Sequence, residues 1–99
     1  MIKNGMRPVH PGEILREDYL IPLGLSANAL AKALHVPTPR INDIVRERRG
    51  VSADTAMRLA RYFGGAARSW LTLQAAYDLR VAEIENARRI EEEIEPAAA

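Results

Sequence analysis

Residues 26–46 read SANALAKALHVPTPRINDIVR and contain two short helical patterns with a proline-rich turn between them. Ser26 can cap a helix through its hydroxyl, and apolar residues then recur at helical spacing as far as Leu34. This first helix must end near His35, because Pro37 and the proline that follows cannot continue it. The pattern predicts a short helix followed directly by a turn.

A second helix start signal comes directly after this turn. Thr38 is placed as an N-cap and Pro39 as the first helical residue, which predicts a helix from about Pro39 to Arg46. The inner face of that helix consists of Ile41, Ile44 and Val45. Two short helices joined by a turn of about three or four residues, the second with a polar outer face, indicate a helix-turn-helix.

The outer face of the second helix carries side chains that can read DNA bases, because the second helix of this motif enters the major groove. Arg40 can bond guanine twice, Asn42 suits adenine, and Asp43 can accept from cytosine or hold a neighbouring arginine. A solvated polar face is the simpler interpretation of an isolated helix, but the flanking motif favours DNA binding. The predicted base-reading residues are Thr38, Pro39, Arg40, Asn42 and Asp43.

Basic residues surround this helix, although the formal net charge of the chain is only +1. Residues 40–68 hold seven arginines against three acidic residues, whereas residues 51–99 hold six basic residues against eight acidic ones. This asymmetry indicates an anionic partner for the middle of the chain. The residues expected to bind phosphate without reading sequence are Ser26, Lys32, Arg46, Arg48 and Arg49.

Length and composition predict a single all-α domain with five helices. Ninety-nine residues with 47% hydrophobic content suit one core, and strand-like alternation is scarce. The expected organisation is an N-terminal leader over residues 1–10, the helical domain over residues 11–95 and a frayed tail over residues 96–99.

The helices that flank the motif have start and stop signals of their own. The first should begin at Pro11 and end at Pro22 and Gly24. Ser52 should cap the fourth helix, which two glycines end after Phe63. A long fifth helix should begin near Ser69, with that serine as its cap.

Several kinds of site are not expected. The chain has no cysteine, and it shows no signal peptide or long apolar run, so we expect a cytoplasmic protein without membrane contact. His10 and His35 lack partners at metal-ligand spacing and are interpreted as cap or turn residues. Catalytic serine and phosphate-binding glycine motifs are also missing from the sequence. We therefore expect no metal, no cofactor and no enzymatic activity.

The final helix carries a long apolar stripe. Its first members, Trp70 and Leu73, are expected in the core. The earlier helices are too short to cover the rest of the stripe, and helix-turn-helix proteins use dimers to reach two half-sites. The candidate dimer-interface residues are Tyr77, Val81, Ile84 and Ile90, with burial in the core as the alternative.

Three ordered blocks resemble known proteins. LAKALHVPTPRINDIVRERRGVSADTAMRLARYFG resembles the lambda-repressor-like (XRE, Cro/CI) DNA-binding fold. With MRPVHPGEIL before it and WLTLQAAYDL after it, the match over about residues 6–80 resembles the HigA family of antitoxins. The sequence departs from that family at His10, where a threonine cap is common, and at GGAARSW, where a Ser-Pro-Glu-Phe-Trp type of helix start is common.

The resemblance implies a homodimer that binds an inverted-repeat operator, represses its own operon and neutralises a HigB toxin, which is a RelE-type endoribonuclease. A phage-type repressor without a toxin is the nearest alternative, and a small basic reading frame beside the gene would argue against it. A protein-binding module whose basic face meets an acidic partner is the second alternative.

The toxin has two expected docking sites. A RelE-type toxin is expected to be basic, which favours the acidic C-terminal end of this chain through charge complementarity. The competing site is the leader MIKNGMRPVHP, which matches the family block and shows no evident role in the core.

Overall fold

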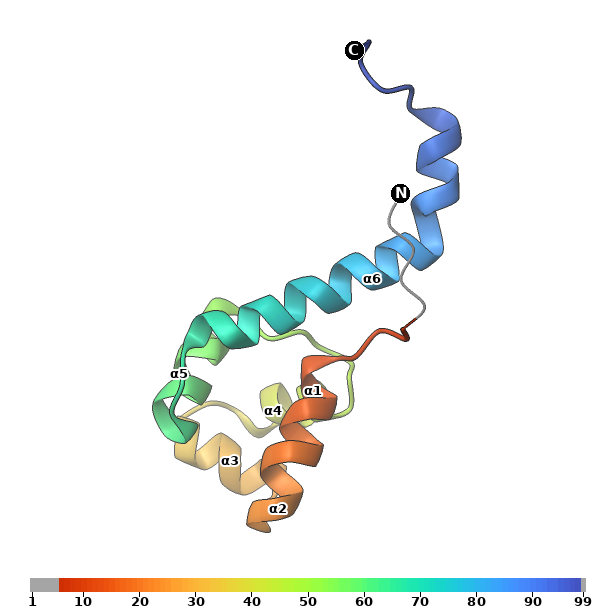
Figure 1. The fold of residues 1–99 in the computed structure, drawn as a ribbon. Helices are drawn as coiled ribbons and strands as arrows, with labels where there is room; N and C mark the ends of the chain where they lie inside the picture. The colour runs from red at the N-terminus through yellow and green to blue at the C-terminus, as the bar shows by residue number, and fades with distance from the viewer. Residues whose placement is uncertain (1–5, 99) are drawn as a thin grey trace.

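A computed structural model describes residues 6–98, and this range is all-helical without a strand. The expectation of an all-α fold with an extended C-terminal helix is confirmed (Figure 1). Residues 1–5 of the predicted leader and Ala99 of the predicted tail lie outside the described range. The elements are α1 (Pro11–Ile14), the π-helical η1 (Leu15–Leu20), α2 (Ile21–Leu23), α3 (Ala27–Leu34), α4 (Thr38–Val45), α5 (Ala53–Phe63) and α6 (Ala67–Glu93).

The first helical segment runs without interruption through α1, η1 and α2, which corrects one expectation. Pro22 does not end the helix; it lies inside α2, and the left-handed Gly24 with a φ of 61° ends it. Just before this proline the bonding is π-helical, and the Ile21 N–H reaches the Arg16 carbonyl. Proline lacks an N–H and its ring crowds the preceding turn, so a wider turn in front of it accommodates the ring.

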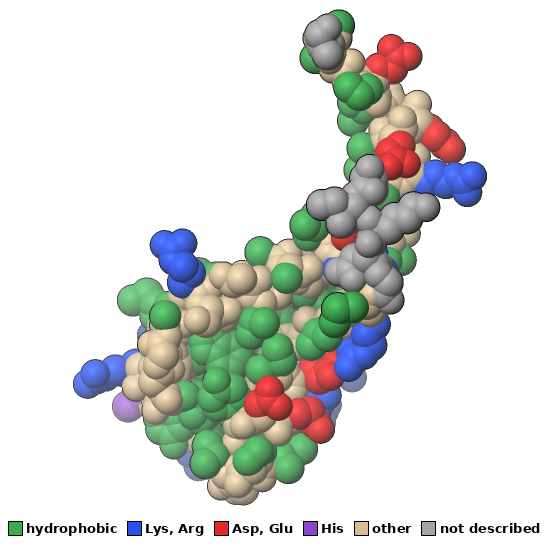
Figure 2. Space-filling view, viewed as in Figure 1, with side chains coloured by type: hydrophobic (Ala, Val, Ile, Leu, Met, Phe, Trp, Pro, Cys, Tyr) green, Lys and Arg blue, Asp and Glu red, His purple; other side chains and the backbone are tan. Residues whose placement is uncertain are grey.

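The core lies where the first helical segment, α3, α4 and α5 meet, and α6 closes it. Tyr19 packs against Phe63 and Trp70, with ring centroids 4.7 and 5.4 Å away. Figure 2 shows hydrophobic side chains gathered over the region between the first helical segment, α5 and α6. The large aliphatic side chains with no exposed surface are Leu15, Leu30, Ile41, Ile44 and Leu59.

Two helix starts differ from the expectation. The N-cap of α4 is Pro37, and the Thr38 hydroxyl bonds a neighbouring helix instead of the α4 backbone. The N-cap of α6 is Ala66, without a side-chain hydrogen bond, so Ser69 lies inside the first turn and is not a cap. In both cases a hydroxyl close to a helix start does not bond the backbone of that helix. The caps that do accept a backbone N–H are His10, Ser26 and Ser52.

The long helix α6 makes the molecule elongated, with extents of 53 × 21 × 21 Å. Its first turns lie against the body, where Trp70 is 5% exposed, and its C-terminal turns extend beyond the body (Figure 1). Ile84 and Ile90 are exposed in that outer part. None of the helices over residues 6–98 is both long enough and apolar enough to cross a membrane.

The segment before α1 packs on α6, which the sequence did not indicate. His10 is only 3% exposed, and its ring meets Tyr77 edge-on with centroids 4.7 Å apart. Arg80 Nε donates to the Met6 carbonyl over 2.8 Å. The expectation that the leader plays no part in the core is therefore wrong for His10, which also caps α1.

Candidate nucleic-acid interface

Helix α4 is fixed to the domain by its inner face and by its last carbonyl groups. Ile41 and Ile44 have no exposed surface. Gly12 of α1 packs so closely on the main chain of α4 that an added Cβ would lie 1.7 Å from the Ile44 oxygen. The Arg16 guanidinium donates to the Val45 carbonyl. The outer face of α4 is therefore held in one orientation by the first helical segment.

The start of α4 is bonded to the start of α3. The Thr38 hydroxyl donates to Asn28 Oδ1 over 2.8 Å, and Asn28 follows the N-cap Ser26 by two residues. Lys32 is one helical turn beyond Asn28 on α3, and its side chain is exposed. Thr38, Asn28 and Lys32 thus lie along one side of the helix pair. In such a motif the first helix crosses the DNA backbone, so the N-terminal part of α3 is a candidate for phosphate contacts.

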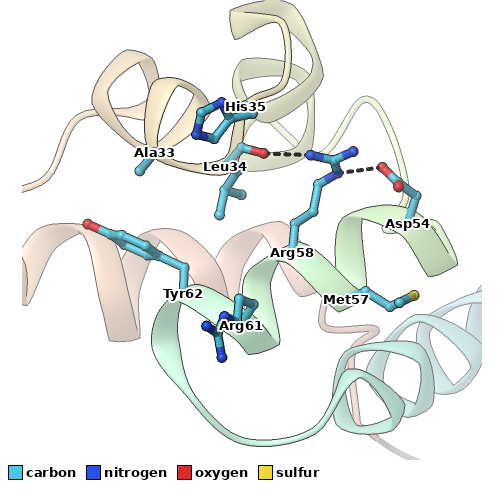
Figure 3. Close-up of a pocket in the computed structure, with 8 residues that line it drawn as sticks. All are labelled: Ala33, Leu34, His35, Asp54, Met57, Arg58, Arg61 and Tyr62. Atoms are coloured by element: carbon cyan, nitrogen blue, oxygen red, sulfur yellow. Dashed lines mark hydrogen bonds and ion pairs between the residues drawn. The ribbon is translucent and has the colours of Figure 1, made fainter.

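Arg40 projects from the first turn of α4 and is bound to α5. Its Nη1 lies 2.8 Å from Asp54 Oδ2, and the same oxygen accepts Arg58 Nε over 2.9 Å. Arg58 also donates from Nη1 to the Leu34 carbonyl over 2.8 Å (Figure 3). The hydrogen bond from Arg58 and, after it, the one from Arg40 hold the pKa of Asp54 below its ordinary value. Asp54 is therefore an anion that joins α4 and α5.

The remaining predicted base-reading residues of α4 differ in solvent exposure and in ion pairing. Pro39 is exposed, and Asn42 is half-buried on the flank of the helix. Asp43 pairs with Arg49, with 3.7 Å between Oδ2 and Nη2. Holding a neighbouring arginine was one of the two roles expected for Asp43, and the structure provides that arginine.

The loop after α4 presents two arginines to solvent. Arg46 and Arg48 are exposed, and no residue within 6–98 forms an ion pair with either. The loop turns at Glu47, which has a φ of 63°. Its far end is tied to α6, because the Val51 N–H donates to Gln74 Oε1 over 2.7 Å. Two free guanidinium groups on an anchored loop form a suitable contact for an anionic backbone.

Residues 15–71 match the helix-turn-helix family. A solved structure of the Pseudomonas aeruginosa antitoxin HigA with the higBA promoter is 53% identical, with a TM-score of 0.90 over 93% of this chain and 100% of that one. The chain belongs to the HigA family of helix-turn-helix proteins.

Two further similar proteins match most of this chain. Antitoxin GraA in complex with its operator is 50% identical, with a TM-score of 0.92 and complete coverage of both chains. Virulence-associated protein I of Dichelobacter nodosus is 70% identical over 81 residues, which cover 82% of this chain and 75% of that relative.

In this HigA-family chain the structure gathers most of the predicted site. The five predicted base-reading residues all lie on α4, although Arg40 and Asp43 are engaged in ion pairs. The predicted phosphate-binding residues come from α3, its N-cap and the loop after α4, and they are all exposed. The candidate interface residues are divided, since Tyr77 packs on His10 and Val81 is half-buried, whereas Ile84 is 58% exposed.

Sequence reasoning missed the residues that position this surface. Asn28 and Asp54 bond the two residues at the start of α4, while Arg58 and Gln74 tie α5 and the loop to their neighbours. Each of these contacts spans ten or more residues of sequence, so no local pattern identifies them. The only available signal was the position of Asn28 in the first turn of α3, beside the N-cap.

Proposed function

We propose that this HigA-family chain is a cytoplasmic antitoxin that binds operator DNA through α4, represses its own operon and neutralises a HigB toxin of the RelE endoribonuclease type. The observation that carries the DNA-binding part is the outer face of α4. There, groups able to bond base edges project from a helix whose inner-face residues Ile41 and Ile44 have no exposed surface. The antitoxin part is supported by membership of the HigA family.

The surface divides into two functional parts. Thr38, Pro39, Arg40, Asn42 and Asp43 read bases, because they occupy the helix that enters the major groove in this motif. The N-terminus of α3 at Ser26, together with the exposed basic side chains around α4, binds phosphate and sets the register. Asp43 and Asp54 place negative charge beside the arginines, which lowers attraction to random DNA and makes the surface selective.

Two subunits are needed to contact enough DNA. One short helix buries too little surface to discriminate an operator from bulk DNA, and a two-fold dimer doubles the contact. The exposed outer part of α6, including Ile84 and Ile90, provides apolar surface for this association.

Substitution of two arginines tests the division between base reading and phosphate binding. Arg40→Ala should weaken binding to the operator by about 1 to 3 kcal/mol and relax the preference at one base position. Arg48→Ala should weaken binding to every sequence alike and lower the salt slope of binding by about 1. Fluorescence anisotropy on operator and random duplexes measures both. Equal losses on the two duplexes for both variants would contradict the assignment.

Co-purification tests the antitoxin part separately. The chain should form a complex with the product of a small basic reading frame beside its gene, and ribonuclease activity should be suppressed in that complex; the absence of such a reading frame would favour a stand-alone repressor. A chain that binds its operator specifically but retains no neighbouring gene product is a stand-alone repressor.

A further inference from the structure

Asp54 joins α5 to α4 at the edge of the candidate DNA surface. It is the second residue of α5, and its side chain is 57% exposed. A single oxygen, Oδ2, accepts from Arg40 on α4 over 2.8 Å and from Arg58 on α5 over 2.9 Å. The Arg40 guanidinium is therefore already paired with a carboxylate from another helix in the structure without DNA.

The carboxylate is itself held in place. Arg58 donates from Nε to Asp54 and from Nη1 to the carbonyl of Leu34, the last residue of α3 (Figure 3). The contacts form a continuous path from the first helix of the motif, through Arg58 and Asp54, to Arg40 on the second helix. Asp54 thus has a defined position relative to both helices.

The contact with Asp54 occupies one end of the Arg40 guanidinium. Nη1 is the donor, which leaves the edge formed by Nε and Nη2 for a second acceptor. Two donors on one edge match the N7 and O6 atoms of guanine. A planar group already held at one end loses less rotamer freedom when its other edge binds.

We propose that Asp54 is a positioning residue for Arg40, which directs the Nε and Nη2 edge toward DNA and thereby sets the base preference of α4. The inference rests on the proposed DNA-binding function and adds a residue outside the helix-turn-helix pair. The Asp54 carboxylate also repels phosphate, so the same group lowers affinity for random DNA while it raises discrimination.

The alternative is an exposed ion pair without influence on recognition. Exposed pairs contribute little to stability, and such a pair would leave base preference unchanged when removed. Base preference therefore separates a positioning role from a merely structural one.

The experiment uses the full-length protein and a pool of random DNA duplexes, from which bound duplexes are selected and sequenced. Asp54→Asn removes the charge but keeps the shape, and Arg40→Ala marks the base position that Arg40 reads. Arg58→Met removes the support of Asp54 but leaves its charge. Asp18→Asn on η1 is the matched control, since Asp18 is exposed and forms no ion pair within residues 6–98. Thermal melting followed by circular dichroism establishes that each variant is folded.

The wild-type chain should enrich duplexes that share a consensus sequence. Arg40→Ala should lose the base preference at one position in each half-site. Asp54→Asn should reduce the base preference at that same position by about tenfold or more. It should also bind random duplexes more tightly than the wild type. Arg58→Met should weaken the same preference in part, and Asp18→Asn should retain it.

Two results would overturn the inference while leaving specific DNA binding intact. In one, Asp54→Asn keeps the full preference that Arg40→Ala loses, and in the other, Arg40→Ala keeps every preference. A wild-type chain that enriches no consensus would instead contradict the proposed function. If Asp54→Asn does not fold, the Arg58→Met variant decides, because an unchanged preference in that variant also overturns the positioning role.

Discussion

His10 shows how one buried side chain can make the stability of the fold depend on pH. Its Nδ1 accepts the Gly12 N–H over 2.8 Å, and its ring packs on Tyr77. Burial lowers the pKa of His10, while the carboxylates of Glu47 and Asp78 act in the opposite direction with smaller effect. The neutral ring is therefore the form that the fold accommodates.

The free energy of unfolding should decrease as the pH falls below about 6.5, because the unfolded chain then binds a proton that the folded chain resists. The decrease should continue until the pH reaches the lowered pKa of His10 in the folded state. His10→Asn offers an oxygen acceptor in place of Nδ1 and removes the titrating group. Urea unfolding at several pH values measures the difference between the two proteins.

The lowered pKa values of Glu13 and Asp54 place their titration in a lower pH range, so these two groups do not obscure this comparison. Hydrogen bonds from Arg7 and Arg58 lower the pKa values of Glu13 and Asp54, respectively, so their stabilising contributions are lost only as the pH falls through those lowered values. Equal pH dependence of the wild type and His10→Asn between about pH 7 and pH 5 would show that His10 is not the titrating group.

Individual residues were predictable where chemistry and position together define a role. Arg40 stood out as a base-reading residue because it lies in the first turn of a helix with a buried inner face. Its partner Asp54 could not be identified, because the two residues are fourteen positions apart and meet only after α5 has packed. The same holds for Thr38, whose hydroxyl bonds Asn28 instead of capping α4.

At the scale of elements, the contact between α1 and α4 determines where the recognition surface lies. Gly12 allows the main chains of the two helices to approach directly, since a Cβ at that position would overlap the Ile44 carbonyl. Backbone atoms cannot move aside as a flexible side chain can, so the helices would have to separate.

Gly12→Ala should destabilise the fold by about 1 to 3 kcal/mol or more, in the range of overpacked cores. It should also weaken operator binding in the fraction that folds, because α4 is displaced. Gly50→Ala is the control, since its added Cβ would meet only the end of the Gln74 side chain, at 2.9 Å. Chemical denaturation and anisotropy titrations measure the two effects. Equal stability losses in the two variants would contradict the backbone argument.

Most helix boundaries were predictable, because caps and glycines act locally. Ser26 and Ser52 cap the helices that they precede, and Gly24 ends the first helical segment in a left-handed conformation. The π-helical bonding of η1 differs from the expectation, because Pro22 is predicted to end the helix, whereas the helix accommodates the proline with a wider turn in front of it. The start of α6 lies before the expected position, with Ala66 and not Ser69 as the N-cap, because no side chain caps it.

At the scale of the whole molecule, the chain consists of a DNA-binding body and an extended arm, which is the outer part of α6. The body contains the helix pair, and the outer part of α6 carries exposed apolar residues together with acidic ones. Figure 1 shows that this arm extends away from α4.

We expect a two-fold dimer that binds an inverted repeat, with half-sites separated by about one helical turn of DNA or a multiple of it. Ile84→Glu should weaken the dimer and operator binding together, because Ile84 is 58% exposed in the monomer and a charge opposes apolar association. Light scattering at micromolar concentration measures the assembly. A monomer in both the free and DNA-bound states would refute the dimer.

Truncation distinguishes the two proposed toxin sites. The acidic-arm proposal predicts that removal of residues 85–99 slows toxin association. The leader proposal predicts that removal of residues 1–8 weakens toxin binding. Replacement of Glu91, Glu92 and Glu93 by glutamine keeps the helix and removes the charge. The acidic-arm proposal is wrong if neither C-terminal change alters affinity or association rate at any salt concentration.

The way in which α4 is anchored has an evolutionary consequence. Its position depends on the buried side chains of its inner face and on the main-chain carbonyls of Ile44 and Val45, which Gly12 and Arg16 approach. Of the outer side chains, those of Thr38 and Arg40 are bonded to other helices, and the rest are free to diverge while the scaffold stays constant. A cell that carries several such operons can keep their operators distinct by exchanging a few surface residues of one helix, and the same exchange is a direct route to designed repressors with new operators.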